Sequence, residues 1–291
     1  TANAFYLRGA RIVFADISED TLTMDAEDVR RRLTGRTRVI VPVHYGGVGC
    51  DMDKLLDLAG SRRIAVVEDN AHGLFARYRG RNLGTLGTFG ALSFHETKNL
   101  ICGVGGALII NDTRYLERAE IVREKGTDRS RFFRGEIDKY TWVGAGSSYQ
   151  PSDMLAAFLY AQLEAREQIM AMRRALWEGY RERLADWAAG RGVRLPFVPG
   201  HCEPSWHLFY LIMQSGEERS RFISHLKEKD IQSVFHYPPL HLSAVGRSLG
   251  GREGDCPVSE RVSGRLVRLP FYNTLSEDDL DSICARIIAF P

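Results

Sequence analysis

The first half of the chain alternates short apolar runs with stretches of helical periodicity. Five runs rich in apolar and β-branched residues predict strands, at 11–17, 38–44, 64–69, 91–95 and 107–111. Between the second and third runs, Met52, Leu55 and Ala59 recur at helical spacing, and Asp51 before them is a residue type that caps helix N-termini. Strands that alternate with helices in this way predict a mainly parallel sheet with right-handed crossovers.

The last two predicted strands follow one another too closely for a helix to cross between them. Their short connection contains three glycines, Gly103, Gly105 and Gly106. We therefore expect the strands at 91–95 and 107–111 to pair antiparallel at one edge of the sheet.

The second half changes from helical to mixed. Apolar residues recur mostly three or four apart through 151–189, which predicts helix; an unbroken helix of that length would run about 58 Å and could leave one domain and enter another. Strands are then predicted at 207–213 and 233–237, and helices at 217–229 and 276–289. We expect a large α/β domain at 1–150, a connecting helical region at 151–189 and a smaller C-terminal α/β domain at 190–291.

Composition narrows the possible partners and compartments. The 291 residues are 44% apolar and 26% charged with a formal net charge of +2, which is typical of a globular chain and too balanced to predict a nucleic-acid partner. No apolar run reaches the roughly 18 residues of a membrane span, and the first residues show no secretion-signal pattern. Five scattered cysteines without a Cys-x-x-Cys pair predict neither a disulfide framework nor a zinc site, and favour the cytoplasm.

Three polar residues are predicted to meet at the carboxyl ends of the strands, where open parallel sheets bind their ligands. Asp69 ends one predicted strand, Ser93 lies late in the next, and Lys98 follows in the loop after it. A carboxylate to keep a pyridine nitrogen protonated, a lysine to form a Schiff base and a hydroxyl to bind phosphate are what pyridoxal phosphate requires. Singly, each is more often a helix cap or a solvated side chain, so the prediction depends on the combination.

Four segments resemble the DegT/DnrJ/EryC1/StrS sugar aminotransferases: Glu-Asp-Asn-Ala-His at 68–72, Ser-Phe-His-Glu-Thr-Lys-Asn at 93–99, Arg-Glu-Lys-Gly-Thr-Asp-Arg-Ser at 123–130 and Asp-Lys-Tyr-Thr-Trp at 138–142. The resemblance runs nearly end to end. It implies a fold-type I transferase, active as a homodimer, with pyridoxal 5'-phosphate as cofactor and L-glutamate as amino donor. Its most similar branch aminates the 4-keto carbon of a TDP-4-keto-6-deoxyhexose, giving TDP-4-amino-4,6-dideoxygalactose for cell-surface polysaccharides such as enterobacterial common antigen and lipopolysaccharide.

The resemblance also implies roles for individual residues. Lys98 matches the lysine of the Schiff base, Asp69 the carboxylate on the pyridine nitrogen, Ser93 a phosphate ligand, and His72 the Gln or His that lies against the cofactor ring. Ser148 matches the segment that reaches the cofactor phosphate of the partner subunit.

The substrate-binding residues are expected in two further segments. The basic and aromatic stretch 123–142 is either a solvated face or a loop that contacts the diphosphate of a nucleotide sugar, in which case Arg129 binds phosphate and Tyr140 stacks on a base or sugar. His236 and Tyr237 lie in a segment that resembles the family's substrate mouth. The spacing of His236 and His241 fits no standard metal site, so no metal is expected.

Two departures from the family pattern keep alternatives open. Val104 stands where the family has an acidic residue, which predicts lower efficiency, and the family's N-terminal Ser/Gly-Thr phosphate-binding segment has no counterpart, so we expect an N-terminally incomplete chain. One alternative is a catalytically silent or incomplete paralogue that acts as a structural or binding subunit. Another is a sugar dehydratase of the same fold, although that branch typically replaces the lysine with histidine, and Lys98 argues against it.

Overall fold

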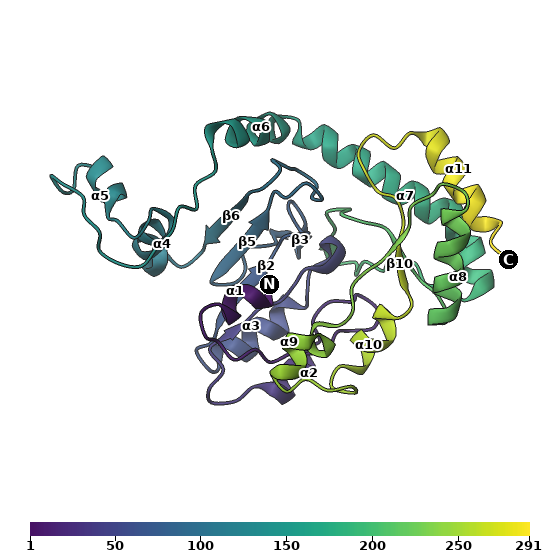
Figure 1. Ribbon diagram of the computed structural model, residues 1–291, viewed down its shortest axis with the longest axis horizontal. Coiled ribbons are helices and arrows are strands. Elements are labelled where there is room, and N and C mark those ends of the chain that lie inside the picture. The colour runs from purple at the N-terminus through teal and green to yellow at the C-terminus, as the bar shows by residue number, and fades with distance from the viewer.

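The largest sheet of the structure, a computed structural model that describes residues 1–291, is mixed and mostly parallel (Figure 1). Its strands follow the order β1 (Val39–Ile40), β2 (Ala65–Asp69), β5 (Phe89–Ser93) and β6 (Gly106–Ile110). The first three run parallel, whereas β6 pairs antiparallel with β5 and places Gly106 opposite Ser93. The predicted α/β class and the antiparallel edge are confirmed.

The crossover between β1 and β2 is the predicted helix, α3 (Met52–Gly60). The Asp51 side chain caps it by accepting a hydrogen bond from the Lys54 amide at 3.4 Å. Met52, Leu55 and Ala59 are buried, so the apolar positions that predicted the helix are the ones that pack against the sheet.

The predicted strand at 11–17 does not form. Only an isolated bridge joins Ile17 to Met24 there. Buried Asp16 explains the difference: its amide donates to Asp28 Oδ2 at 2.7 Å, and its own Oδ2 accepts from the Val258 amide at 2.9 Å. The Asp16 amide is therefore bonded to a side chain and not to a neighbouring strand.

The predicted helical region 151–189 forms two helices, α6 (Asp153–Glu164) and α7 (Arg166–Arg191), which follow one another along one side of the molecule (Figure 1). The break falls at Ala165, which has φ −88° and ψ 10°. α7 ends at Gly192, whose left-handed conformation, φ 63°, favours glycine.

The C-terminal part forms a second, antiparallel sheet in the order β8 (Tyr210–Ile212), β10 (Leu266–Arg268), β9 (Val234–Phe235). Two helices accompany this sheet, α8 (Gly216–Lys227) and α11 (Glu277–Ile288). The two predicted strands and two predicted helices form here, the strands shorter than the sequence pattern indicated, but the prediction missed β10, the middle strand of this sheet. A small third sheet joins β4 (Arg81–Asn82), β3 (Arg77–Tyr78) and β7 (Cys202–Glu203).

The remaining elements are short. They are the helices α1 (Ala2–Tyr6), α2 (Ala26–Arg32), α4 (Leu116–Arg123), α5 (Arg129–Phe133), α9 (Ala244–Ser248) and α10 (Pro257–Ser263), and the 3-10 turns Tyr45–Gly47, Thr113–Tyr115 and Leu240–Leu242. The segment that contains α4 and α5 projects from the body of the molecule, and we call residues 113–150 the projecting arm (Figure 1).

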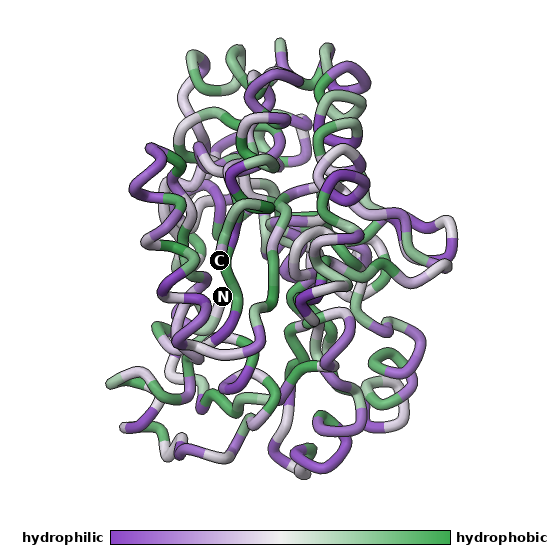
Figure 2. Tube along the Cα trace, turned by 90° about the vertical axis from the view of Figure 1, so that its right-hand side faces the viewer, coloured by the Kyte–Doolittle hydropathy of each residue, from purple (hydrophilic) through white to green (hydrophobic).

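Two hydrophobic clusters account for most of the buried apolar residues. One, of 18 residues, packs α7, α8 and α11 around the second sheet; the other, of 14 residues, packs α2 and α3 against the first. Figure 2 shows hydrophobic and hydrophilic residues alternating along the helices, as expected where one helix face is buried. No helix combines the length and the apolar character that crossing a bilayer requires.

Candidate active site

Asp69 lies at the carboxyl end of β2, where the sequence places a ligand-binding carboxylate. Its Oδ1 accepts a hydrogen bond from the Ala71 amide at 3.1 Å, and its Oδ2 accepts one from the Thr1 hydroxyl. Its backbone is fixed as well, because the His44 amide donates to the Asp69 carbonyl at 3.2 Å. The carboxylate is thus held at the carboxyl end of β2, and one of its oxygens accepts a hydrogen bond from a hydroxyl group.

Glu68, one residue earlier, is fully buried and belongs to the support of the site. It accepts three backbone amides, from Gly84, Leu86 and Gly87, each at 2.7 Å, and a fourth hydrogen bond from His44 Nε2 at 3.0 Å. Burial raises the pKa of Glu68, but the hydrogen bonds from His44 and the amides outweigh it, so the pKa lies below its ordinary value. A buried carboxylate therefore anchors residues 84–87 to β2.

Lys98 lies in the loop after β5 and is half-buried. Burial lowers the pKa of its ammonium, the Asp69 carboxylate opposes that shift, and the positive charge of Arg268 adds to it; the net direction is downward. No hydrogen bond contributes to this balance. Lys98 is an amine with an unoccupied donor and a larger neutral fraction than a solvated lysine, as amine chemistry requires.

His72 presents a neutral ring beside Lys98. Its Nδ1 accepts a hydrogen bond from the Gly46 amide at 3.3 Å, which leaves the ring proton on Nε2. Burial, and then the positive charge of Lys98, lower the pKa of His72 to about 3. The ring stacks on His207, with centroids 4.1 Å apart and planes 27° apart.

Tyr45 and His236 extend this wall of rings. The Tyr45 hydroxyl is hydrogen-bonded to His236 Nδ1, and their centroids are 5.3 Å apart. Burial raises the pKa of Tyr45, so its hydroxyl stays protonated and donates, whereas burial lowers the pKa of His236 to about 4. The rings near Lys98 are therefore uncharged at neutral pH.

The turn at 45–47 requires glycine for its geometry. Gly46 and Gly47 have φ angles of 64° and 83°, and a Cβ on Gly47 would collide with the Ser205 hydroxyl. This turn fixes both the Tyr45 ring and the amide that binds His72.

A buried polar network connects the ring wall to the loop of Lys98. His207 Nδ1 donates to Asn99 Oδ1 at 2.8 Å, because the Asn99 amide nitrogen is directed to the Ser205 carbonyl at 2.7 Å. Arg173 donates to the carbonyl of His207 and to Asn273 Oδ1, the latter at 2.7 Å. Asn99 is adjacent to Lys98, so this network ties the lysine loop to the rings.

The structure brings four of the predicted residues together: Asp69, His72, Lys98 and His236. Ser93 is the last residue of β5, and its hydroxyl accepts the His95 amide at 3.4 Å. The site also contains three residues that sequence reasoning missed, Tyr45, His207 and Arg268, whose interactions with the predicted residues are described above. Their segments carry no local signal of such a role.

The other predicted residues lie elsewhere in this chain. Arg129 packs over the rings of Phe133 and Tyr140, at 4.9 and 5.7 Å, and Ser148 pairs with Glu124, all on the projecting arm (Figure 1). Arg129, Tyr140 and Ser148 are therefore separated from Lys98 within one chain.

Two further predicted positions lie at or near the surface. Tyr237 is 68% exposed, and its ring centroid lies 4.6 Å from that of His236. Val104, which replaces an acidic residue of the family pattern, is 76% exposed. Neither side chain is part of the buried ring wall.

The two histidines considered as metal ligands have separate partners. His241 Nε2 is hydrogen-bonded to Glu260 Oε1 at 2.7 Å, whereas His236 bonds to Tyr45. No group of three His, Cys, Asp or Glu side chains in residues 1–291 is arranged to hold a metal ion.

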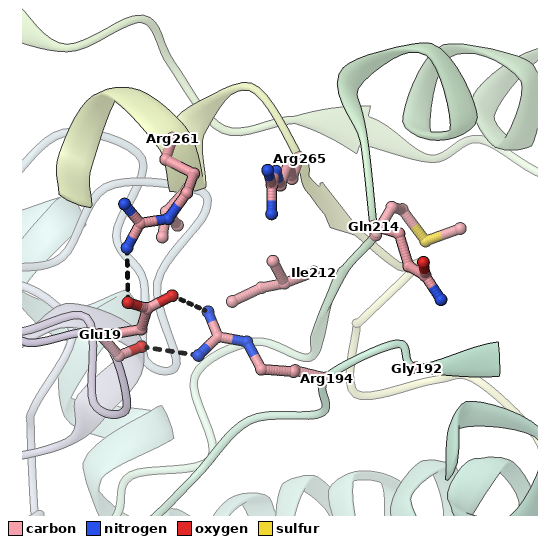
Figure 3. Close-up of a pocket in the computed structure, with 9 residues that line it drawn as sticks. Glu19, Gly192, Arg194, Ile212, Gln214, Arg261 and Arg265 are labelled. Atoms are coloured by element: carbon pink, nitrogen blue, oxygen red, sulfur yellow. Dashed lines mark hydrogen bonds and ion pairs between the residues drawn. The ribbon is translucent and has the colours of Figure 1, made fainter. Parts of the chain in front are cut away.

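A separate surface pocket of about 340 Å³ contains none of the residues around Lys98 (Figure 3). The Glu19 carboxylate pairs there with Arg194, at 3.5 Å, and with Arg261. Arg265 also lines the pocket but forms no ion pair, and Figure 3 shows it apart from Glu19. One carboxylate thus faces three arginines, and the pocket retains a net positive charge.

Comparison with known proteins agrees with this geometry. A family model described as the DegT/DnrJ/EryC1/StrS aminotransferase family matches residues 1–288. The spore coat polysaccharide biosynthesis protein SpsC of Bacillus subtilis is 31% identical over 295 residues, an alignment that covers 99% of this chain and 75% of SpsC.

Two solved structures are similar over nearly the whole chain. Spr1654 of Streptococcus pneumoniae, named as a putative sugar aminotransferase, is 25% identical to this chain. Its PMP form superposes with a TM-score of 0.90 over 99% of this chain and 78% of Spr1654, and its PLP form with a TM-score of 0.89. The aminotransferase TlmJ of Streptoalloteichus hindustanus is 30% identical, with a TM-score of 0.88 over 99% of this chain and 75% of TlmJ.

Proposed function

Because the chain belongs to the DegT/DnrJ/EryC1/StrS aminotransferase family, we propose that it moves an amino group from L-glutamate to the 4-keto carbon of a TDP-4-keto-6-deoxyhexose, giving TDP-4-amino-4,6-dideoxygalactose. The observation that carries this proposal is the meeting of Lys98, Asp69 and neutral His72 in one site. The PLP and PMP forms of Spr1654 support pyridoxal 5'-phosphate as the cofactor.

The residues present fit that cofactor. The Lys98 amine has no hydrogen-bond partner to displace, and its pKa is lowered by burial. Asp69 Oδ2 accepts a hydrogen bond from a hydroxyl, so its free lone pairs are suited to a pyridine N–H. The neutral His72 offers a flat face for a ring, and Ser93 a hydroxyl for the phosphate.

In the proposed mechanism, each residue has one task. Pyridoxal phosphate, when bound, supplies the electron sink that transamination requires. Lys98 Nζ would act first as general base, removing the proton from the donor's α-carbon, and then as general acid, giving that proton back later in the transfer. Its lowered pKa assists the first of these tasks. Asp69 would keep a proton on the pyridine nitrogen of the bound cofactor through its negative charge, and His72 would pack against the cofactor ring.

In a homodimer, the residues of the projecting arm that lie far from Lys98 in their own chain would contribute to the partner subunit's site. Large apolar side chains on α6 and the projecting arm are exposed: Trp142 (76%), Met154 (83%), Phe158 (55%) and Tyr160 (63%). A second copy of this chain that covered them would place Ser148, Arg129 and Tyr140 of one subunit near the other's site, where phosphate and nucleotide recognition need them. Tyr237, beside His236, would then contact the sugar.

The product would serve cell-surface polysaccharide synthesis. The role of SpsC in spore coat polysaccharide biosynthesis supports this assignment, and enterobacterial common antigen or lipopolysaccharide would be the destination of a 4-amino-4,6-dideoxygalactose unit. Five free, buried cysteines are favoured in a reducing compartment, which supports a cytoplasmic reaction.

Incubation with L-glutamate and TDP-4-keto-6-deoxyglucose, followed by mass spectrometry, tests the proposal. We expect an amino sugar nucleotide whose formation is abolished in Lys98→Ala. Other nucleotides and other keto sugars, supplied in parallel, test the finer assignment. A deoxygenated product without nitrogen would identify a dehydratase, and no product from a cofactor-loaded, folded protein with any acceptor would identify a silent paralogue.

A further inference from the structure

The surface pocket of Figure 3 forms where separate parts of the chain meet. Glu19 comes from the loop before α2, Arg194 from the segment after α7, and Arg261 from α10. Arg265, between α10 and β10, is the fourth charged residue of the pocket. Three guanidinium groups against one carboxylate leave two positive charges without a counterion from the chain.

The backbone that carries two of these arginines is fixed by hydrogen bonds. Arg194 exchanges two with Ile212 of β8, at 3.1 and 2.9 Å. The Arg265 amide donates to the Val262 carbonyl at 2.9 Å, and the Arg265 carbonyl accepts the Met213 amide at 3.1 Å. The positions from which the side chains extend are therefore set before a ligand arrives, which lowers the entropy cost of binding.

Most of the arginine donors have no acceptor within the chain. A guanidinium has five N–H groups. Arg194 directs two nitrogens at Glu19, one at its carbonyl at 3.3 Å and one at its carboxylate at 3.5 Å, and Arg261 directs one nitrogen at the same carboxylate. Arg265 forms no ion pair, and Figure 3 shows it between Arg261 and Gln214, apart from Glu19. The pocket thus offers several fork-shaped donors and few acceptors.

Partial burial increases the effect of this imbalance. The side chains of Arg194 and Arg261 are 39% and 37% exposed, so water screens their charges less than it screens those of fully solvated arginines. Reduced screening strengthens both the repulsion among the arginines and their attraction for an anion. A concave surface with one sign of charge in excess also concentrates ions of the opposite sign.

The positive charge continues beyond this pocket. At Gln214 it adjoins a second pocket, of about 450 Å³, which is lined by Arg191 and Arg221 and by one carboxylate, that of Glu218. Arg191 and Glu218 lie 3.5 Å apart and form an ion pair, which leaves Arg221 as an additional cation. The charge distribution is therefore better matched to an extended anion than to a single small one.

We propose that this pocket binds the diphosphate group of a small molecule, a function separate from amino transfer. Guanidinium forks pair with phosphate oxygens through two parallel hydrogen bonds. A diphosphate carries at least the two negative charges that the pocket lacks, and its two phosphoryl groups can meet Arg265 on one side and Arg194 and Arg261 on the other. A carboxylate supplies only one charge and fits less well.

Free pyrophosphate and a nucleotide both carry this group. The apolar residues that line the pocket, Ile212, Met213 and Val262, are 6%, 1% and 4% exposed, so they offer little surface on which a base could pack. We therefore expect recognition of the diphosphate itself.

Calorimetric titration of inorganic pyrophosphate into the cofactor-loaded protein, at constant ionic strength and without divalent cations, tests the proposal. Arg265→Gln should weaken binding roughly 10-fold, because a charged bidentate contact is lost. Glu19→Gln removes the competing carboxylate at nearly constant volume and should strengthen binding several-fold. Changes of opposite sign within one pocket are not expected from a general loss of structure.

The matched control is Arg36→Gln, which removes an exposed arginine outside both pockets and should leave binding unchanged. Orthophosphate should bind more weakly than pyrophosphate. Thymidine diphosphate distinguishes the two sources: an Arg265-dependent affinity equal to that of pyrophosphate assigns the diphosphate alone, and a higher affinity assigns a nucleotide.

Pyrophosphate binding that withstands both Arg265→Gln and Glu19→Gln overturns the proposal, as does orthophosphate binding of equal strength. If Arg265→Gln fails to fold, Glu19→Gln decides, since unchanged or weaker binding in that variant contradicts the proposal. A sugar nucleotide bound near Lys98 would give a separate binding step that neither substitution alters. Failure of the proposed function and failure of this site are therefore distinguishable.

Discussion

Replacement of Glu68 by glutamine tests whether a buried carboxylate supports the active-site strand. Glu68 Oε1 accepts the amides of Leu86 and Gly87, and Oε2 accepts the amide of Gly84 and His44 Nε2. Glutamine has one oxygen and one NH₂ group, so in either orientation two buried donors face another donor. His44 cannot relieve this conflict by moving its proton, since its Nδ1 accepts the Cys50 amide at 3.2 Å.

The expected cost follows from those contacts. Each buried donor left unsatisfied costs about 1–3 kcal/mol, so Glu68→Gln should lower the free energy of unfolding by about 3–5 kcal/mol. At roughly 2–3 °C per kcal/mol for a chain of this size, Tm should fall by about 6–15 °C. Glu182→Gln, an exposed change on α7, is the matched control and should stay within about 0.5 kcal/mol.

Chemical and thermal unfolding at several pH values provide the assay. The folded-state pKa of Glu68 is depressed, so its ionised form stabilises the fold above the ordinary value of 4.5, and that contribution is lost as the pH falls through the folded-state pKa. The difference between wild type and Glu68→Gln should therefore narrow in acid. A loss below about 1 kcal/mol at pH 7, or a difference that grows in acid, would refute the reasoning.

Two further predictions concern the residues that face the cofactor. Asp69→Asn removes a negative charge at nearly constant volume, so exchange of the donor's α-proton in deuterated water should slow by orders of magnitude. Asp186→Asn, the same change at an exposed position of α7, is the control and should leave the exchange rate unchanged. An unchanged exchange rate in Asp69→Asn would remove Asp69 from the mechanism. His72 has a folded-state pKa of about 3 against an ordinary 6.5, so the unfolded chain binds the extra proton and His72 lowers stability as the pH falls below 6.5. As the pH is lowered from 7 to 5, the free energy of unfolding of His72→Gln should therefore rise by about 1–2 kcal/mol relative to that of the wild type, as measured by urea unfolding. A difference that stays constant over this range would show that His72 is not buried in its neutral form.

Local periodicity was sufficient to predict the parallel strands β1, β2 and β5 and the antiparallel edge strand β6. β2 and β5 are parallel neighbours, so Asp69 at the carboxyl end of β2 and Lys98 in the loop after β5 lie at the same end of the sheet, and the charge of Asp69 acts on Lys98. That argument needs only strand direction and sequence position, and both are encoded locally.

Long-range contacts explain what sequence reasoning missed. The segment 11–17 has the composition of a strand, but Asp16 is bonded to Val258 and Ser259, more than 240 positions later. Arg268 has the local features of an ordinary basic residue in a strand. Its effect on the pKa of Lys98 depends on how β10 packs against a part of the chain that is far away in sequence. The break at Ala165 involves neither glycine nor proline, so no local signal marks it.

The central claim, that amino transfer takes place at Lys98, is tested most directly by trapping the cofactor. The pyridoxal-phosphate-loaded protein is reduced with borohydride, digested and mapped by mass spectrometry, with and without prior addition of L-glutamate. The account predicts a pyridoxyl group on the peptide that contains Lys98 and on no other, and its loss when glutamate is added first. Label on a different lysine, or label on Lys98 that glutamate does not remove, would contradict it.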